Sequence, residues 1–130
     1  MDPSQHLSDG RIRYRYPTSI AVPYRLSQIA RTPAVQLAHT LGTIDETVRL
    51  LCWIHLADYL GATASETPDP SVEEALAGLA EPTTVRLVEL LQRLAASAVP
   101  AQPFVPELKT ALAGELGQQL ETLVTDSTAI

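Results

Sequence analysis

The sequence has few of the residues on which several common protein classes depend. Its one cysteine, Cys52, excludes an internal disulfide framework and a cysteine-based zinc site. Aromatic residues make up only 5% of the 130 residues, so a core must consist mainly of Leu, Val, Ala and Ile. No apolar run approaches the roughly 18–20 residues that span a bilayer, and the first ten residues lack the apolar segment of a signal peptide. We therefore expect a cytoplasmic protein without disulfides and without a membrane partner.

Basic residues are also scarce outside the N-terminal quarter of the chain. Residues 1–31 carry five arginines and two aspartates, a net charge of +3. Residues 32–130 carry four basic and thirteen acidic side chains, a net charge of −9. A domain that binds duplex nucleic acid usually has a basic surface. Nucleic acid is therefore expected as a partner only through the N-terminal residues.

These residues, 1–16, are predicted to form a flexible or extended basic arm that ends in the alternating stretch RIRYRY. In an extended backbone Arg11, Arg13 and Arg15 point to one side, and the isoleucine and tyrosines point to the other. The arginines suit phosphate and the tyrosines suit base stacking, so the arm is a possible RNA contact. We favour the alternative, in which the apolar side lies on the protein's own helices and the arginines meet acidic groups or a protein partner.

The rest of the chain has helical periodicity. Between residues 33 and 61 the apolar residues are spaced by four and three, which predicts one continuous apolar face: Leu37, Leu41, Ile44, Val48 and Leu51. Thr32 before Pro33 is the capping signal of this helix, and Pro23 and a capping box of Ser71 with Glu74 mark the starts of two others. The further helices are predicted over 23–30, 72–79, 83–98 and 106–125, the last with possible breaks at Gly114 and Gly117. Phe104, in the linker before the last helix, is expected to fill the core. The predicted fold is all-α, a helical bundle of five or six helices with a long central helix. Its predicted limits are a single helical domain over 17–126 and a tail over 127–130.

From Val48 onward the long helix is apolar on nearly every side. A helix of this kind lies in the centre of a bundle or at an interface between chains. The large apolar and aromatic residues of this stretch, Leu51, Trp53 and Tyr59, are therefore candidates for an interface or a pocket.

Arg49 and His55 lie in the same stretch, at a spacing that occurs in ribonucleases of the HEPN class. Six residues of helix turn through about 600°, so the two side chains project about 120° apart and do not share a face. A nuclease site would therefore have to be composed across a dimer. We favour a packing role, in which His55 is partly buried and bonded to a neighbour such as Asp58, and Arg49 pairs with Asp45.

The sequence predicts neither a metal site nor a cofactor. Its three histidines, His6, His39 and His55, do not have the spacing of a metal motif, and no glycine-rich phosphate loop occurs. Cys52 lies among leucines, as an inert buried thiol does.

Residues 16–60 begin with Tyr-Pro-Thr-x-Ile and close on Leu-Ala-Asp-Tyr-Leu, and residues 104–108 read Phe-x-Pro-Glu-Leu. In these features the chain resembles a HEPN-like helical domain of large bacterial signalling and conflict proteins. The resemblance covers most of 16–113. In that family an Arg-Asn-x-x-x-His-Gly motif tends to follow the Phe-x-Pro-Glu-Leu segment, but here residues 114–130 contain no such motif. Either the chain is a fragment that ends before it, or this version lacks it.

We therefore expect a non-catalytic helical module for interaction or oligomerisation in a bacterial signalling or defence system. Its partner would be a protein or a second copy, with a homodimer favoured. The first alternative is a HEPN-type ribonuclease with Arg49 and His55 composed at a dimer interface. The second is a small-ligand sensor with a pocket lined by Trp53, His55 and Tyr59.

Overall fold

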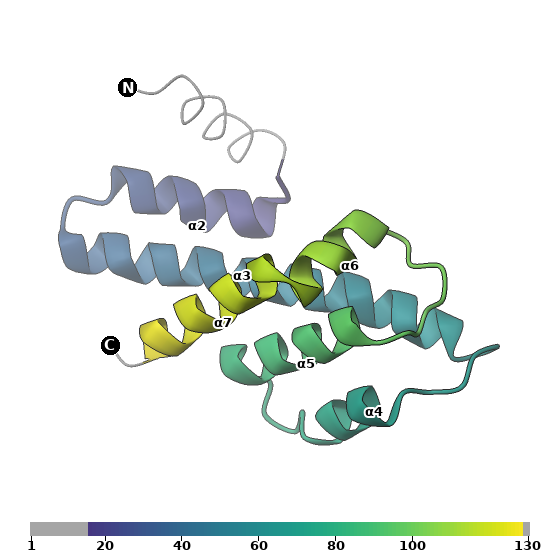
Figure 1. Ribbon diagram of the computed structural model, residues 1–130. Coiled ribbons are helices and arrows are strands. Elements are labelled where there is room, and N and C mark those ends of the chain that lie inside the picture. Colours follow the sequence, from purple (N-terminus) through teal and green to yellow (C-terminus); the bar gives the residue numbers. More distant parts are fainter. Residues whose placement is uncertain (1–15, 129–130) are drawn as a thin grey trace. The chain divides into compact units, whose positions relative to one another are not determined.

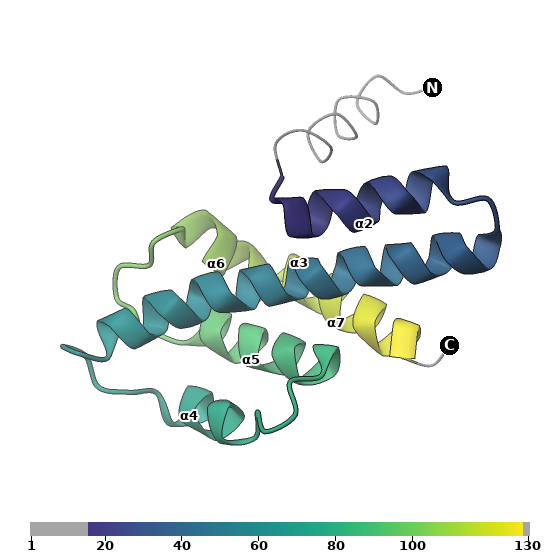
Figure 2. The same ribbon diagram turned by 180° about the vertical axis from the view of Figure 1, so that it is seen from behind.

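A computed structural model describes residues 16–128, and these residues contain helices and loops without any strand (Figures 1 and 2). The helices are α2 (Thr18–Ile29), α3 (Pro33–Ala62), α4 (Pro70–Ala77), α5 (Thr84–Ala96), α6 (Pro106–Ala113) and α7 (Glu115–Thr128). The predicted all-α helical bundle with one long helix is thus confirmed. Most of the predicted arm, including Arg11, Arg13 and Arg15, lies outside the described residues.

The chain divides into two compact units, residues 1–47 and 48–130, and α3 passes from the first into the second. In the first unit, α2 and the N-terminal part of α3 run antiparallel, side by side (Figures 1 and 2). The connection is capped as predicted, because the Thr32 hydroxyl accepts a hydrogen bond from the amide of Val35 at 3.3 Å.

The start of α2 differs from the sequence prediction, which placed Pro23 in the first helical turn. The helix begins at Thr18 and holds Pro23 in its interior. The carbonyl of Pro17 accepts hydrogen bonds from the amides of Ile20 and Ala21 and so closes the first turn earlier than predicted. Pro23 lies against Gly42 of α3, where a Cβ would stand 3.8 Å from that of the proline. A Cβ at this distance would make an ordinary van der Waals contact, so the approach of the two helices does not require glycine, and Gly42 does not interrupt α3.

In the second unit the core is built around α5, which packs against α4, α6 and α7. One side of α5 is buried along its whole length: Leu87, Val88, Leu90, Leu91, Leu94 and Ala95. Leu91 and Ala95 form a cluster with Leu112 of α6, and Leu51 of α3 packs against this cluster. The apolar repeat of the sequence thus becomes a core of aliphatic side chains, as the low aromatic content requires.

The start of α4 also differs from the prediction. The sequence suggested a capping box of Ser71 and Glu74, but the capping residue is Asp69, whose carboxylate accepts the amide of Ser71 at 2.9 Å. Glu74 instead lies 3.4 Å from Arg93 of α5. An aspartate that precedes Pro70 is an equally good start signal, because proline at the first helical position needs no amide donor.

The C-terminal helical region breaks at Gly114, which separates α6 from α7. Gly117 lies three residues further on, inside α7, and is buried. A Cβ at position 117 would collide with the carbonyl oxygen of Leu112. Gly117 thus lets the first turn of α7 pass directly over the last turn of α6.

Candidate functional site

The structure gives the predicted pair of Arg49 and His55 two separate environments. His55 is buried, with 7% of its surface exposed, and its Nδ1–H donates to the Leu51 carbonyl at 2.8 Å. This partner lies one turn back along α3 and is not Asp58, the neighbour suggested from the sequence. Arg49 is partly buried, and its guanidinium reaches the carbonyl of Pro82 at 3.5 Å. Within one chain, therefore, His55 has little surface on which a substrate phosphate could bind.

The three residues predicted for an interface or a pocket differ from one another in solvent exposure. Leu51 is half-buried and packs against the core cluster. Tyr59 is completely buried. Only Trp53 has half of its surface exposed. Trp53, His55 and Tyr59 therefore do not line a common open pocket.

Tyr59 is held by polar groups at the start of α4. Its hydroxyl donates to the Glu73 carboxylate at 2.8 Å and accepts the amide of Asp69 at 3.0 Å. Burial raises the pKa of the Tyr59 phenol, and the bond to Glu73 adds to this shift. The pKa of Asp69 is lowered by hydrogen bonds from the Ser97 hydroxyl and the Ser71 amide. These contacts fix the end of α3 to α4 and carry no open ligand position.

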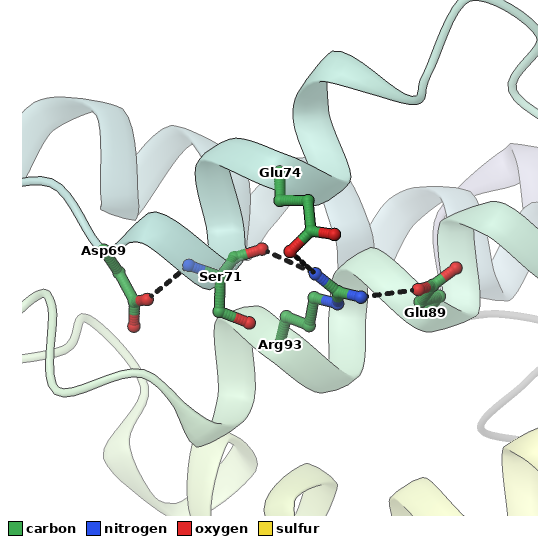
Figure 3. A network of polar contacts seen from close by, with 5 residues as sticks. All are labelled: Asp69, Ser71, Glu74, Glu89 and Arg93. Carbon is green, nitrogen blue, oxygen red and sulfur yellow. Dashed lines mark hydrogen bonds and ion pairs between the residues drawn. The ribbon is translucent and has the colours of Figure 1, made fainter.

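Arg93 makes a second polar network on α4 and α5 (Figure 3). One guanidinium nitrogen donates to the Ser71 carbonyl at 2.9 Å and lies 3.4 Å from the Glu74 carboxylate. The other donates to Glu89, one turn earlier on α5, at 2.8 Å. Two carboxylates and a carbonyl share one cation, so this network joins the two helices and the charge of Arg93 is already matched by acidic partners.

Trp53 belongs to an apolar stripe on the exposed side of α3. Trp53, Ala57 and Leu60 are spaced by four and three residues and are all exposed. At 100° per residue they project within about 60° of each other. The buried residues of the same helix stretch, Cys52 and Tyr59 among them, project from another side. The C-terminal part of α3 therefore has a core face and a separate apolar face on the surface.

The linker between α5 and α6 lies next to this stripe and is held by two carboxylates of the preceding segments. Asp58 accepts the backbone amide of Phe104 at 2.9 Å, and Glu66 accepts that of Ala101 at 2.9 Å. The Phe104 side chain is 81% exposed, so the expectation from the sequence that it fills the core is wrong. Its backbone is anchored at Asp58, beside Ala57 of the stripe, while its ring faces solvent.

An open cleft of about 460 Å³ separates the end of α3 from this linker. Its walls are Ala57, Asp58, Gly61, Ala62, Glu66, Pro100, Ala101 and Gln102. Both carboxylates in these walls already hold linker amides. The chemistry of the cleft is therefore that of small apolar side chains with a polar margin, which suits a protein segment better than a charged ligand.

The exposed stripe of Trp53, Ala57 and Leu60, the cleft that Ala57 also lines, and the exposed Phe104 of the linker are together named the Trp53 face below. Within residues 16–128 no group of three histidine, cysteine or carboxylate side chains could hold a metal ion. Over the same range no helix is both long and apolar enough to cross a membrane. No protein-family model, curated protein or solved structure matches the chain.

Proposed function

We propose that this chain is a non-catalytic helical interaction and oligomerisation module, which docks another protein on the Trp53 face. One observation carries the proposal: Trp53 and Leu60 are exposed on one side of α3, and Ala57 between them also lines the cleft, whose other wall is the linker that carries the exposed Phe104. Interface residues that contribute most to binding are enriched in tryptophan, and aromatic residues are enriched in interfaces generally. An exposed apolar surface of this kind is a typical mark of an interaction site.

We further propose that the chain is a HEPN-like domain of a bacterial signalling or defence protein, as the resemblance in its sequence implies. Two features support a binding role over a catalytic one: His55 is buried, and the guanidinium of Arg93 is already hydrogen-bonded within the protein. Anchoring by Asp58 also supports it, because a fixed Phe104 loses less conformational entropy on binding than a loose loop would.

Site-directed photocrosslinking in the source cells tests the docking face. A photoreactive amino acid at position 60, inside the Trp53 face, is expected to give one dominant protein adduct. The same amino acid at position 123, an exposed leucine on α7, is the matched control and should not give that adduct. Equal adduct patterns at the two positions would contradict a specific docking face.

The single tryptophan supplies an independent readout on purified protein. When the crosslinked partner is added, the emission of Trp53 should move to shorter wavelength and become harder to quench with iodide, because the indole leaves water. Unchanged emission at saturating partner would place the contact elsewhere.

A further inference from the structure

Helix α2 carries apolar residues on two opposite sides. Ile20, Ala21 and Ser27 are buried. Val22, Leu26 and Ile29 are 46%, 38% and 71% exposed, at spacings of four and three residues. At 100° per residue these three project within about 60° of each other and on the side of α2 away from Ile20 and Ser27. We call Val22, Leu26 and Ile29 the α2 stripe.

A surface helix of a soluble domain normally presents polar residues on its outer side. The α2 stripe instead leaves the outer side apolar along most of a short helix. The described residues of this unit, 16–47, contain only α2 and part of α3, so the unit buries few side chains of its own. A partner packed on the α2 stripe would supply apolar contacts that this helix pair lacks.

The α2 stripe is complementary to itself. Val22 precedes Leu26 by four residues, and Ile29 follows it by three. If two copies of α2 pack antiparallel about a two-fold axis, Leu26 meets Leu26 of the second copy and Val22 meets its Ile29. Such an isologous contact is the commonest way in which identical chains associate.

Charge favours the same arrangement. Arg31 lies in the turn at the end of α2, whereas Glu46 lines a cleft with Val22 near its start. Antiparallel packing therefore brings Arg31 of each copy towards Glu46 of the other. The first unit, residues 1–47, holds five arginines and four acidic side chains, a net charge of +1, while residues 48–130 carry −7. Two copies of the first unit therefore repel each other less than two copies of the second unit do.

We infer that a second copy of this chain covers the α2 stripe, as an antiparallel, two-fold dimer. Three partly exposed side chains do not reach the roughly 800 Å² per partner of a standard interface, so the dimer is expected to be weak and concentration-dependent. The inference depends on the oligomerisation half of the proposed function and leaves the Trp53 face to a different protein.

Sedimentation velocity on the full chain, from micromolar to millimolar concentration, should show a reversible monomer–dimer equilibrium. Leu26→Glu should weaken the dimer at least about tenfold, because it buries two carboxylates against each other. Gln28→Glu makes the same charge change on the same helix, about 130° from the middle of the stripe, and should leave the dimer unchanged. Circular dichroism of each variant checks that helix content is retained.

A charge reversal then tests the identity and orientation of the partner. Arg31→Glu and Glu46→Arg should each weaken the dimer, and the double variant should restore it. A wild type that remains monomeric at every concentration would overturn the inference, as would a double variant no tighter than either single one. Photocrosslinking at position 60 is read separately, so a monomeric chain that still gives the position-60 adduct rejects the dimer and not the docking face.

Discussion

The hydroxyl of Tyr59 donates to the carboxylate of Glu73 at 2.8 Å and accepts the amide of Asp69 at 3.0 Å. The buried phenol thereby hydrogen-bonds both the N-cap residue of α4, Asp69, and a carboxylate in its first turn, Glu73. Residues 59 and 73 come from different helices, so this contact is a tertiary one and fixes the path of the loop between them.

Tyr59→Phe should lower the free energy of unfolding by about 1–3 kcal/mol, since the Asp69 amide loses a buried partner. Urea unfolding followed by circular dichroism measures this change. Tyr16→Phe removes a hydroxyl from a half-exposed tyrosine and should change stability by less than about 0.5 kcal/mol. Equal effects of the two substitutions would mean that the Tyr59 bonds add nothing to stability.

Asp69 should make the free energy of unfolding depend on pH in the acid range. Its pKa is lowered in the folded state by the Ser97 hydroxyl and the Ser71 amide, so its contribution is present above the unfolded pKa of about 4. The contribution is lost as the pH falls through the folded pKa. The unfolding free energy of Asp69→Asn should therefore fall less steeply below about pH 4 than that of the wild type.

Asp126→Asn is the matched control for this titration, because Asp126 is an exposed carboxylate on α7. Its acid dependence should follow the wild type. Ser97→Ala should reproduce part of the Asp69→Asn behaviour, and parallel curves for all four proteins would show that Asp69 is not the group responsible.

Cys52 should react slowly with thiol reagents while the chain is folded. Burial raises the pKa of the thiol to about 11, from an ordinary value near 9. At pH 8 the thiolate fraction is then about a hundredfold lower than for an exposed cysteine, and the side chain is also inaccessible. A chromogenic disulfide reagent added to folded and urea-unfolded protein measures the ratio of rates, and similar rates would contradict a buried thiol.

His55→Ala should destabilise the fold by about 1–3 kcal/mol, because it removes a buried ring and the hydrogen bond to Leu51. Arg49→Ala should cost less than about 1 kcal/mol, since its contact with the Pro82 carbonyl is long and solvent-exposed. RNA cleavage by the wild type that disappears in both variants while both stay folded would favour the composite ribonuclease over the packing role.

Local signals in the sequence were sufficient to predict most helices. The hydroxyl of Thr32 before Pro33, the period of the leucines and the glycine at 114 all act within a few residues of the structure they determine. Start sites were less certain: Pro17 and Asp69 compete with Pro23 and Ser71 for the same role, and tertiary packing decides between them.

The contacts that define the Trp53 face depend on residues far apart in the chain. Phe104 was predicted to fill the core because a large apolar side chain gains most from burial. Asp58, 46 residues away, fixes its backbone instead, while leucines of α5 to α7 fill the core. Of the apolar face predicted on α3 only Val48 is buried, with Cys52, His55 and Tyr59 beyond it, and Leu37 is 40% exposed. The period of the leucines thus identifies the core face of α3 only in part, and it cannot show that Trp53, Ala57 and Leu60 remain uncovered.

Gly117 also provides a way to find relatives of this chain. Because any side chain there would collide with the Leu112 carbonyl, the position has no tolerated substitute unless α6 and α7 move apart. Leucines of the core can exchange for other aliphatic residues of similar volume with modest loss. In a diverged sequence we therefore expect the identities of the apolar residues to change first. A glycine five residues after a buried aliphatic position would still identify the register of the last two helices.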